Sequence, residues 1–355
     1  MRNLLYVVWL TIYLLFMLSL GPFAERKYFL KLIRVYVYSN IFISIVGIVQ
    51  FVLFFVGIDF YLAQVFASNF PRVNGFSYEP SYYATFLITG FVTNLYLLNH
   101  KSAYFSYPLL LINQALMFIA IFLSTSKLVI PIMLLSLLLV SFKDVLRKMF
   151  SNFSIYMKDL ALVPILMLTL LIPIYYIVFD FEKVRFLFDG LGIAGGVSHS
   201  VTFRERDLDA TYKAFTQSPV VGYSLGGVAS AIGEIRGVRV TNNELAKENE
   251  GMNVFIETLA GSGIIGFLFF IWFLFSLFKK PLAAAKRLER KDHEYESGIL
   301  LRALFWGGLI LLFMLNFNQN ILRPFLWIHF AMLNTAYFYA KIISKENNIE
   351  KALKK

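Results

Sequence analysis

Three basic side chains that could bind a phosphate or diphosphate group lie far apart in the chain. Arg72 stands in NFPRVNGFSYEPSYYA, Lys127 in STSKLVI and Arg204 in TFRERDLDATYKAF. A guanidinium group binds phosphate oxygens through two parallel hydrogen bonds, whereas an ammonium group binds them as a point charge. Plainer interpretations stay open, because Arg72 could contact solvent or lipid phosphate and Lys127 could only extend its ammonium group to the membrane surface.

Acidic residues stand at the starts of two predicted helices. Glu79 precedes Pro80, where it could orient Arg72, act as a general base or only favour the positive end of the helix dipole. Asn253 and Glu257 lie about one turn apart and can share a helix face. The GSGIIG sequence that follows is typical of close helix packing. It does not indicate a dinucleotide site, because no strand precedes it.

The long polar segment between these motifs combines basic residues with a turn rich in glycine. Apolar residues at helical spacing predict a short helix resting on the membrane surface: Leu208, Tyr212 and Phe215. Arg204 and Arg206 lie near its start, and Pro219 and Gly222 follow it. This combination suits a diphosphate group, although glycines in a loop usually serve only as turns.

The composition indicates the elements that must position these residues. The chain is 58% hydrophobic and only 15% charged, with a mean hydropathy of +0.67. Its apolar runs are continuous rather than alternating, so they predict membrane-spanning helices and not barrel strands. The absence of cysteine excludes disulfides, thiolate metal sites and a thiol nucleophile. We therefore predict an all-α, polytopic transmembrane helical bundle.

Nine apolar runs are long enough to be spans. We place them near residues 4–20, 35–57, 81–98, 103–123, 127–142, 159–179, 253–278, 299–317 and 324–341. Ionisable residues are almost absent from these runs, which argues against an ion-coupled transporter, because such proteins usually keep charged residues at membrane depth.

The distribution of lysine and arginine predicts the orientation. Nine spans place the basic short segments on one side: 25–34, 101, 143–158, 279–302 and 341–355. The short segments of the other side carry only Arg2, Arg72, Lys127 and Arg323. Because basic short loops stay in the cytoplasm, the C-terminus is predicted to be cytoplasmic. The same retention explains the net charge of +11 without nucleic-acid binding.

This orientation divides the chain into three parts. Residues 1–179 form the N-terminal transmembrane helices, and residues 180–252 form one large extracytoplasmic loop containing short surface helices. Residues 253–355 form the C-terminal transmembrane helices and a basic cytoplasmic tail.

Four short motifs, in their order along the chain, resemble the O-antigen polymerase and ligase superfamily of bacterial envelope glycosyltransferases. The family's first two motifs are an arginine followed by a glycine and a helix-starting proline, and a Ser-Arg pair that opens a span. They are matched by Arg72, Gly75 and Pro80, and by Ser126 and Lys127. The third motif, an arginine before a proline and glycine, and the fourth, an asparagine, an acid and Gly-x-x-Gly, match the later segments. The residues are Arg204, Pro219 and Gly222, and Asn253, Glu257, Gly263 and Gly266.

The resemblance covers roughly residues 70 to 275, with two departures. Lys127 stands where the family usually has arginine. Met252 stands where ligases of the family commonly have histidine, which favours a polymerase over a ligase.

The resemblance implies transfer of a glycan from a polyprenyl diphosphate carrier to a sugar hydroxyl of another undecaprenyl-diphosphate-linked repeat unit. The reaction would occur at the outer face of the bacterial cytoplasmic membrane. Arg72 and Arg204 would stabilise the leaving diphosphate, and Glu79 or Glu250 would accept the acceptor proton. Further residues would bind substrate: Lys127, Arg206, Gly222, Asn253, Glu257 and Arg323. We expect no metal and no cofactor, with membrane lipid, a chain-length regulator and a flippase as further partners.

Three alternatives stay open at this point. A ligase of the same superfamily would transfer finished chains, so its loss would leave chains on the lipid carrier. A lipid or glycan flippase would need a wide polar cavity, against which the scarcity of charge within the spans argues. A receptor or scaffold would not need the basic residues to converge.

Overall fold

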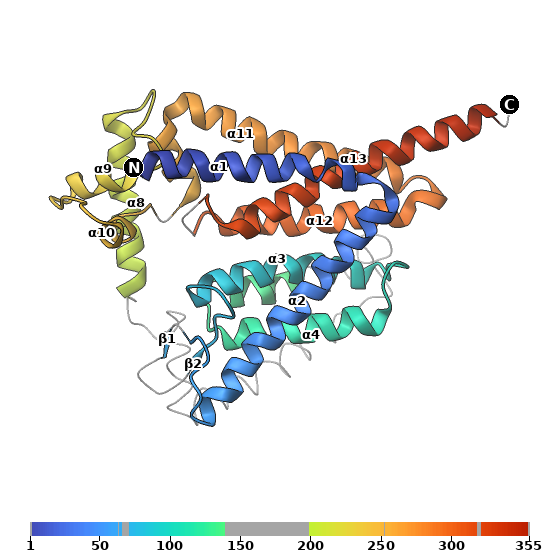
Figure 1. Cartoon of the computed structure of the whole chain (residues 1–355), viewed down its shortest axis with the longest axis horizontal. Coiled ribbons are helices and arrows are strands. Elements are labelled where there is room, and N and C mark those ends of the chain that lie inside the picture. The colour runs from blue at the N-terminus through green and yellow to red at the C-terminus, as the bar shows by residue number, and fades with distance from the viewer. Residues whose placement is uncertain are drawn as a thin grey trace, which may run out of the picture. The chain divides into compact units, whose positions relative to one another are not determined.

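The structure is a computed structural model of the whole chain, and it describes residues 2–62, 64–65, 71–138, 199–251, 253–317 and 321–353. The described residues are mostly helical and fall into two compact units (Figure 1). Unit 1 has residues 2–38, 100–106 and the described residues from 199 onward. Unit 2 has residues 39–99 and 107–138. The N-terminal helix thus belongs to the same unit as the C-terminal helices.

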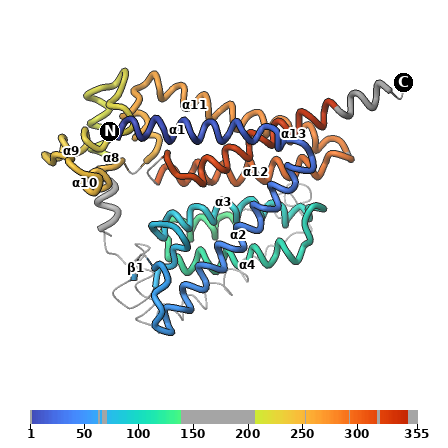
Figure 2. The backbone as a smooth tube through the Cα atoms, viewed as in Figure 1, coloured from blue at the N-terminus to red at the C-terminus, as the bar shows by residue number. Residues whose placement is uncertain are grey.

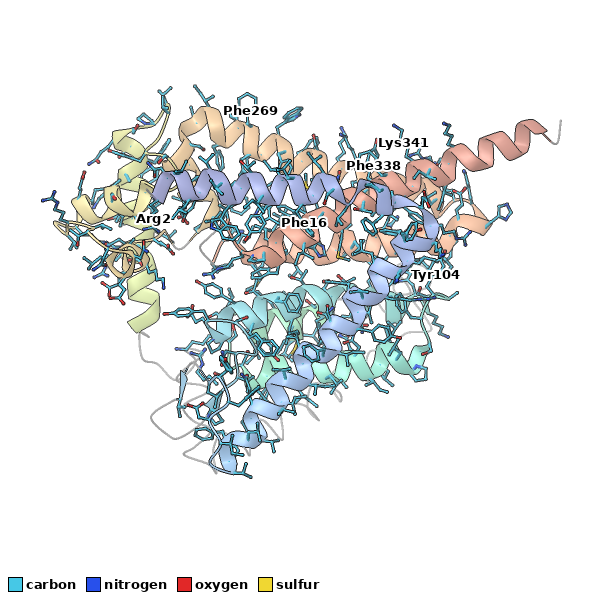
Figure 3. All side chains as sticks on the ribbon, in the orientation of Figure 1. Arg2, Phe16, Tyr104, Phe269, Phe338 and Lys341 are labelled. Atoms are coloured by element: carbon cyan, nitrogen blue, oxygen red, sulfur yellow. The ribbon has the colours of Figure 1, made fainter. Side chains whose placement is uncertain are left out.

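Unit 1 is a bundle of helices, and its loop segment forms three further helices. Its helices are α1 (Arg2–Ser19), η1 (Gly21–Ala24), the first part of α2 (Arg26–Phe55), α8 (His199–Gln217), α9 (Val228–Ile235), α10 (Asn243–Glu248), α11 (Val254–Leu288), η2 (Asp292–Glu294), α12 (Tyr295–Met314) and α13 (Pro324–Leu353). α11, α12 and α13 pack against one another, and α1 packs against α13 (Figure 2). Outward-facing residues of α11 are large and apolar, and Phe269 points away from the bundle (Figure 3).

One histidine lies inside the bundle of unit 1. His329 of α13 is buried, and its Nε2 lies 2.9 Å from the backbone oxygen of Leu304 in α12. The ring also makes an edge contact with Tyr36. His329 lies in a predicted span and joins α13 to α12.

Unit 2 is built from the second part of α2, α3 (Pro80–Asn99), α4 (Tyr107–Leu123) and the helix Val129–Leu138. A short antiparallel pair, β1 (Gln64–Val65) and β2 (Pro71–Arg72), precedes α3. Polar side chains join α3 to α4: Asn94 donates to Gln114 Oε1 at 2.6 Å, and Asn113 donates to Asn94 Oδ1 at 3.1 Å. Such bonds hold helices together where the surroundings are apolar.

Helices lie at eight of the nine predicted positions, and the ninth, 159–179, lies outside the described residues. Among the described residues, four helical segments are long and apolar enough to cross a membrane: Arg2–Ala24, Arg26–Phe55, Val254–Leu288 and Tyr295–Met314. The number of spans, the orientation and the sidedness of the loop stay predictions. Several helices extend beyond the apolar runs, because lysine and arginine are good helix formers that a hydropathy pattern does not count.

The predicted loop helix lies within α8, and the contact of its apolar face with a membrane surface stays a prediction. Described residues 199–251 of the loop form α8, α9 and α10, with 180–198 outside the description. α8 buries Ala210 and Ala214 against α9 and α11, while Tyr212 is 56% exposed. Small side chains form the buried face of α8 because they let helices approach closely. A search for large apolar residues does not detect such a face.

Candidate functional site

A cluster of charged and aromatic side chains lies at one end of unit 1, where α1, α11 and α13 all begin. We call it the Glu250 cluster; its members are Arg2, Tyr6, Glu250, Glu257 and Arg323. A guanidinium nitrogen of Arg2 lies 2.7 Å from Glu250 Oε1. The same guanidinium group lies over the Tyr6 ring, 5.9 Å from its centroid.

Glu250 is the most chemically unusual member, because only 7% of the residue is exposed. Burial raises its pKa above the ordinary value of 4.5, and this effect outweighs the opposing attraction of Arg2, Arg323 and Lys247. Removing a carboxylate from water disfavours its charged form, so the group binds a proton more readily. A carboxyl with a raised pKa beside fixed cations is typical of a general acid or base.

The segment that carries Glu250 is held by the loop helices. Arg236, which follows α9, forms an ion pair with buried Asp207 of α8. Its other terminal nitrogen donates to Asn249 Oδ1 at 3.0 Å and to the Glu248 backbone oxygen at 3.2 Å. Arg236 therefore fixes the two residues before Glu250. By contrast, Arg206 is exposed, and its Nε lies 3.8 Å from Asp207 Oδ1. Arg206 therefore does not hold the segment before Glu250 as Arg236 does.

Asn253 fixes the start of α11. Its side-chain oxygen accepts hydrogen bonds from the backbone nitrogens of Phe255 and Ile256, at 2.9 and 3.1 Å. Its side-chain nitrogen donates to the backbone oxygen of Asn316 at 3.0 Å. Asn253 is thus a helix cap that also joins α11 to the end of α12. The position predicted for substrate binding has a structural role in this geometry.

The helix α11 is broken at Gly263, whose φ is 60° and ψ is −174°. A turn of the loop repairs the break: Ile264 donates its N–H to the Pro219 oxygen at 2.9 Å, and Tyr223 donates to the Ala260 oxygen at 3.0 Å. The GSGIIG sequence therefore serves close packing, as expected, but its partner is this loop turn rather than another helix.

Gly222 lies within that turn. Its φ is +75°, and a Cβ at this position would lie 2.5 Å from backbone atoms of Gly261. Only glycine fits both requirements. The short distance to α11 accounts for Gly222 through packing rather than through the approach of a ligand.

Arg323 is positioned by the segment before α13. The backbone oxygen of Leu322 accepts from Tyr13 Oη of α1 at 2.9 Å, and that of Ile321 accepts from Trp327 Nε1 at 2.6 Å. Arg323 is half-buried, and its charge lowers the pKa of Glu250. Glu257, in the first turn of α11, is buried near Tyr6. The cluster thus brings together three of the predicted site residues: Glu250, Glu257 and Arg323.

A second polar cluster lies in unit 2, at the start of α3 and the end of α4. We call it the Arg72 cluster; its members are Arg72, Glu79 and Thr125, with Lys127 in the same turn as Thr125. Arg72 Nε donates to Thr125 Oγ1 at 2.8 Å. Burial lowers the pKa of Arg72, and the attraction of Glu79 opposes this without cancelling it. Burial removes water from this cation, so binding an anion would stabilise its charge.

Glu79 serves the start of α3 as well as Arg72. Its backbone oxygen accepts from the N–H groups of Tyr82 and Tyr83, at 3.1 and 3.3 Å. Its carboxylate accepts from Ser81 Oγ at 3.3 Å. These contacts favour the interpretation of Glu79 as a residue that begins a helix and orients Arg72.

The loop of the Arg72 cluster is fixed by Gln50 of α2. Gln50 Oε1 accepts from the backbone nitrogens of Asn74 and Gly75, at 3.3 and 2.8 Å, and its nitrogen donates to the Gly75 oxygen at 2.8 Å. Directly after Arg72, the Val73 N–H donates to the Leu123 oxygen at 3.3 Å. Arg72 is therefore presented from a rigid loop, and Lys127, which is half-buried, follows from the next turn.

Two predicted positions fall outside what the structure describes. Arg204 belongs to α8, but its side chain is not among the described residues, and Met252 is not described. The convergence of Arg72, Lys127 and Arg204 on one diphosphate stays a prediction. Within the described part of the chain, no group of three or more histidine and carboxylate side chains could hold a metal ion.

Sequence reasoning missed Arg2, Tyr6 and Arg236 as members or supports of a site. A signal existed for Arg2, because the predicted orientation places it with Arg323 on the side poor in basic residues. No signal marked Arg236, whose partner Asp207 lies 29 positions earlier across two helices.

Protein-family models, curated proteins and solved structures were compared with the chain, and none of them matches it. No family is shown. The two clusters therefore have to carry the functional argument through their own geometry, together with the motif resemblance.

Proposed function

We propose that the protein is a polysaccharide polymerase of the bacterial envelope, at the outer face of the cytoplasmic membrane. It would transfer a glycan from a polyprenyl diphosphate carrier to a sugar hydroxyl of another lipid-linked repeat unit. The proposal is supported by one group of each charge, one in each unit: the buried Glu250 carboxyl, whose pKa is raised, and the half-buried Arg72 guanidinium, whose pKa is lowered.

These groups match the two demands of glycosyl transfer. The bond between the anomeric carbon and the diphosphate oxygen breaks, and the departing diphosphate gains negative charge. Arg72, with Lys127 and Arg204 as further cations, would stabilise that charge. The acceptor oxygen forms the new glycosidic bond and loses its proton, which the Glu250 carboxylate would accept. Glu250 is favoured over Glu79 as the base, because burial raises the pKa of the Glu250 carboxyl.

The remaining members of the Glu250 cluster support this role. Arg2 and Arg323 lower the pKa of Glu250, so they keep a fraction of it ionised and ready to accept a proton. Glu257 and Tyr6 add polar groups near the acceptor position, where sugar hydroxyls would bind. We further propose that both clusters face the same side of the membrane, as the charge distribution predicts.

Reconstitution tests the function. The purified chain, in liposomes with an undecaprenyl-diphosphate-linked repeat unit as its only substrate, should yield products that differ in mass by whole repeat units and should release free undecaprenyl diphosphate. A ligase would leave this substrate unchanged until a second acceptor is added. Translocation of the lipid without chain growth would indicate a flippase. Either result would contradict the proposal.

A further inference from the structure

A pocket lies between α1, α11 and α13 at the end of unit 1 away from the Glu250 cluster. Its volume is about 160 Å³. We call it the Lys280 pocket; the lining residues that matter are Ser276, Lys280, Asn334, Tyr337, Met17 and Phe273. By volume it corresponds to roughly five water molecules, enough for a phosphate and part of a glycerol but too small for an oligosaccharide.

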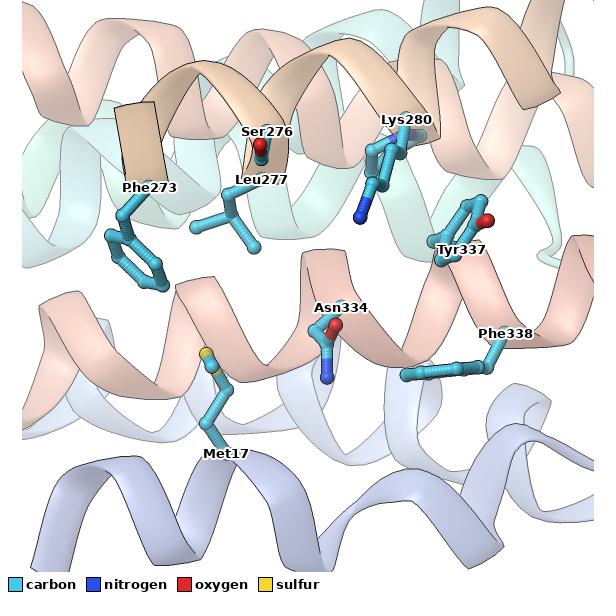
Figure 4. A pocket seen from close by; sticks show the side chains of 9 residues that line it. Met17, Phe273, Ser276, Leu277, Lys280, Asn334, Tyr337 and Phe338 are labelled. Carbon is cyan, nitrogen blue, oxygen red and sulfur yellow. The ribbon is translucent and has the colours of Figure 1, made fainter. Parts of the chain in front are cut away.

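The two ends of the Lys280 pocket differ in chemistry (Figure 4). The Lys280 ammonium points into the space between α11 and α13, towards the Asn334 amide, and lies 5.7 Å from the centroid of the Tyr337 ring. This cation–π contact holds the charge at the mouth of the pocket. Met17 and Phe273 lie at the other end and are apolar. The pocket therefore combines the cation of an exposed lysine with an apolar surface.

The depth of Lys280 along α11 suits a headgroup. Lys280 follows Gly263, where α11 is broken, by 17 positions, which corresponds to about 26 Å of helix at the usual rise. A hydrocarbon core is about 30 Å thick. The continuous part of α11 after Gly263 therefore covers most of that thickness and carries Lys280 towards a headgroup layer. Lys279 precedes Lys280, Lys286 and Arg287 follow it, and all four are exposed.

We propose that the Lys280 pocket binds an anionic glycerophospholipid. The headgroup phosphate would lie on the Lys280 ammonium, with Asn334 and Ser276 as hydrogen-bond donors. One acyl chain would run along Phe273 and Met17. Basic pockets between membrane helices bind anionic headgroups in this way, because fixed cations at headgroup depth attract the phosphate while the apolar helix surfaces accept the chain. This site does not depend on the proposed enzymatic function.

Native mass spectrometry of the full chain in neutral detergent tests the site, with phosphatidylglycerol and phosphatidylcholine as probes. The wild-type chain should retain phosphatidylglycerol in preference to phosphatidylcholine. Lys280→Gln should weaken phosphatidylglycerol binding about fivefold, as expected for loss of one basic side chain at the headgroup. Lys286→Gln is the matched control on the same helix outside the pocket, and it should bind within about twofold of wild type.

Two further arms separate the pocket from general attraction. Asn334→Leu keeps the charge but removes the amide, so it should also weaken phosphatidylglycerol binding. Soluble glycerol 3-phosphate should not compete, because it lacks the acyl chain. The proposal is overturned if Lys280→Gln binds like wild type, if Lys286→Gln loses as much affinity as Lys280→Gln, or if the two lipids bind equally well. Competition by glycerol 3-phosphate would indicate that the pocket binds a free phosphate ester rather than a lipid. This result would also overturn the proposal.

Discussion

The Glu250 cluster and the Arg72 cluster are opposites in charge but alike in construction. In each, one charged group lies near the end of a helix, and burial shifts its pKa more than its neighbours shift it back. Burial favours the protonated form of Glu250 and weakens the hold of Arg72 on its proton. An acid made more basic can accept a proton, and a half-buried guanidinium group can bind an anion. Under the proposed function, the Glu250 cluster would accept the proton and the Arg72 cluster would stabilise the leaving group of the same reaction.

The two clusters also differ in how the chain assembles them. Arg72 reaches Thr125 across 53 positions within unit 2. Arg2 reaches Glu250 across 248 positions, from the first turn of α1 to the segment before α11. The Glu250 cluster therefore depends on the packing of unit 1 as a whole. Substitutions that loosen this bundle should affect the acid more than the cation.

The largest expected effect follows from removing the acidic group of the Glu250 cluster. Glu250→Gln keeps the size of the side chain and an acceptor for Arg2 but removes the base, so we expect the rate of chain extension to fall by about 10²- to 10⁴-fold. Because burial raises the pKa of Glu250, the folded state binds more protons than the unfolded state between the ordinary and the raised value. Stability from this group therefore falls as pH rises through that window.

Glutamine at position 250 does not ionise, so the variant does not lose this stability as pH rises. The thermal midpoint at neutral pH should therefore not fall. Size-exclusion profiles and thermal midpoints of wild type and variant give the folding control. A variant that folds and still extends chains at the normal rate would exclude Glu250 as the base.

The next effect breaks the cation side. Arg72→Ala should lower the rate of chain extension by about 10²- to 10³-fold, because one fixed donor to the leaving diphosphate is lost. Arg72→Lys should retain part of the activity, since it keeps the charge without the two-pronged geometry. Arg239→Ala, an exposed arginine of the loop, is the matched control and should be active. If the three variants behave alike, Arg72 has no special role.

A smaller effect sharpens the comparison through pH. Arg2 lowers the pKa of Glu250, so Arg2→Gln should raise that pKa further. The base is protonated as pH falls below its pKa, and the acidic limb of the rate profile should therefore move to higher pH in the variant. Lys213→Gln serves as the control, because Lys213 is exposed and pairs with Asp209 instead. An unmoved acidic limb in Arg2→Gln would show that Glu250 does not control the rate.

The smallest effect concerns the turn that repairs the break in α11. Gly222→Ala should lower the free energy of unfolding by about 1–3 kcal/mol, through the positive φ and the contact with Gly261. Gly237→Ala isolates the backbone part, because its φ is +71° but a Cβ there would meet nothing within 4 Å. Chemical denaturation compares the two. Equal losses would mean that the close approach of the turn to α11 contributes nothing.

The sequence predicted the helices well and the clusters unevenly. Long apolar runs predict helices directly, because a helix satisfies its backbone hydrogen bonds within one segment inside a bilayer. Arg72 and Glu79 were predicted together, since they lie in one motif. Arg2 was not linked to Glu250, because their pairing arises from tertiary packing that no local pattern encodes.

Two further features were beyond local patterns. Asp207 pairs more closely with Arg236 than with the adjacent Arg206, because Arg236 folds back onto α8 from the end of α9. The break at Gly263 depends on Pro219 and Tyr223, which complete its hydrogen bonds from outside the helix. Glycine spacing alone suggested packing without showing the partner.

The central claim is that the two clusters act on one substrate, and a distance between them tests it most directly. The chain has no cysteine, so spin labels can be placed singly at Tyr78→Cys, beside Glu79, and at Glu248→Cys, beside Glu250. Pulsed electron resonance on the doubly labelled protein in liposomes should give a distance well below the roughly 30 Å of a hydrocarbon core. A distance of about 40 Å or more would place the clusters on opposite faces and would contradict the account.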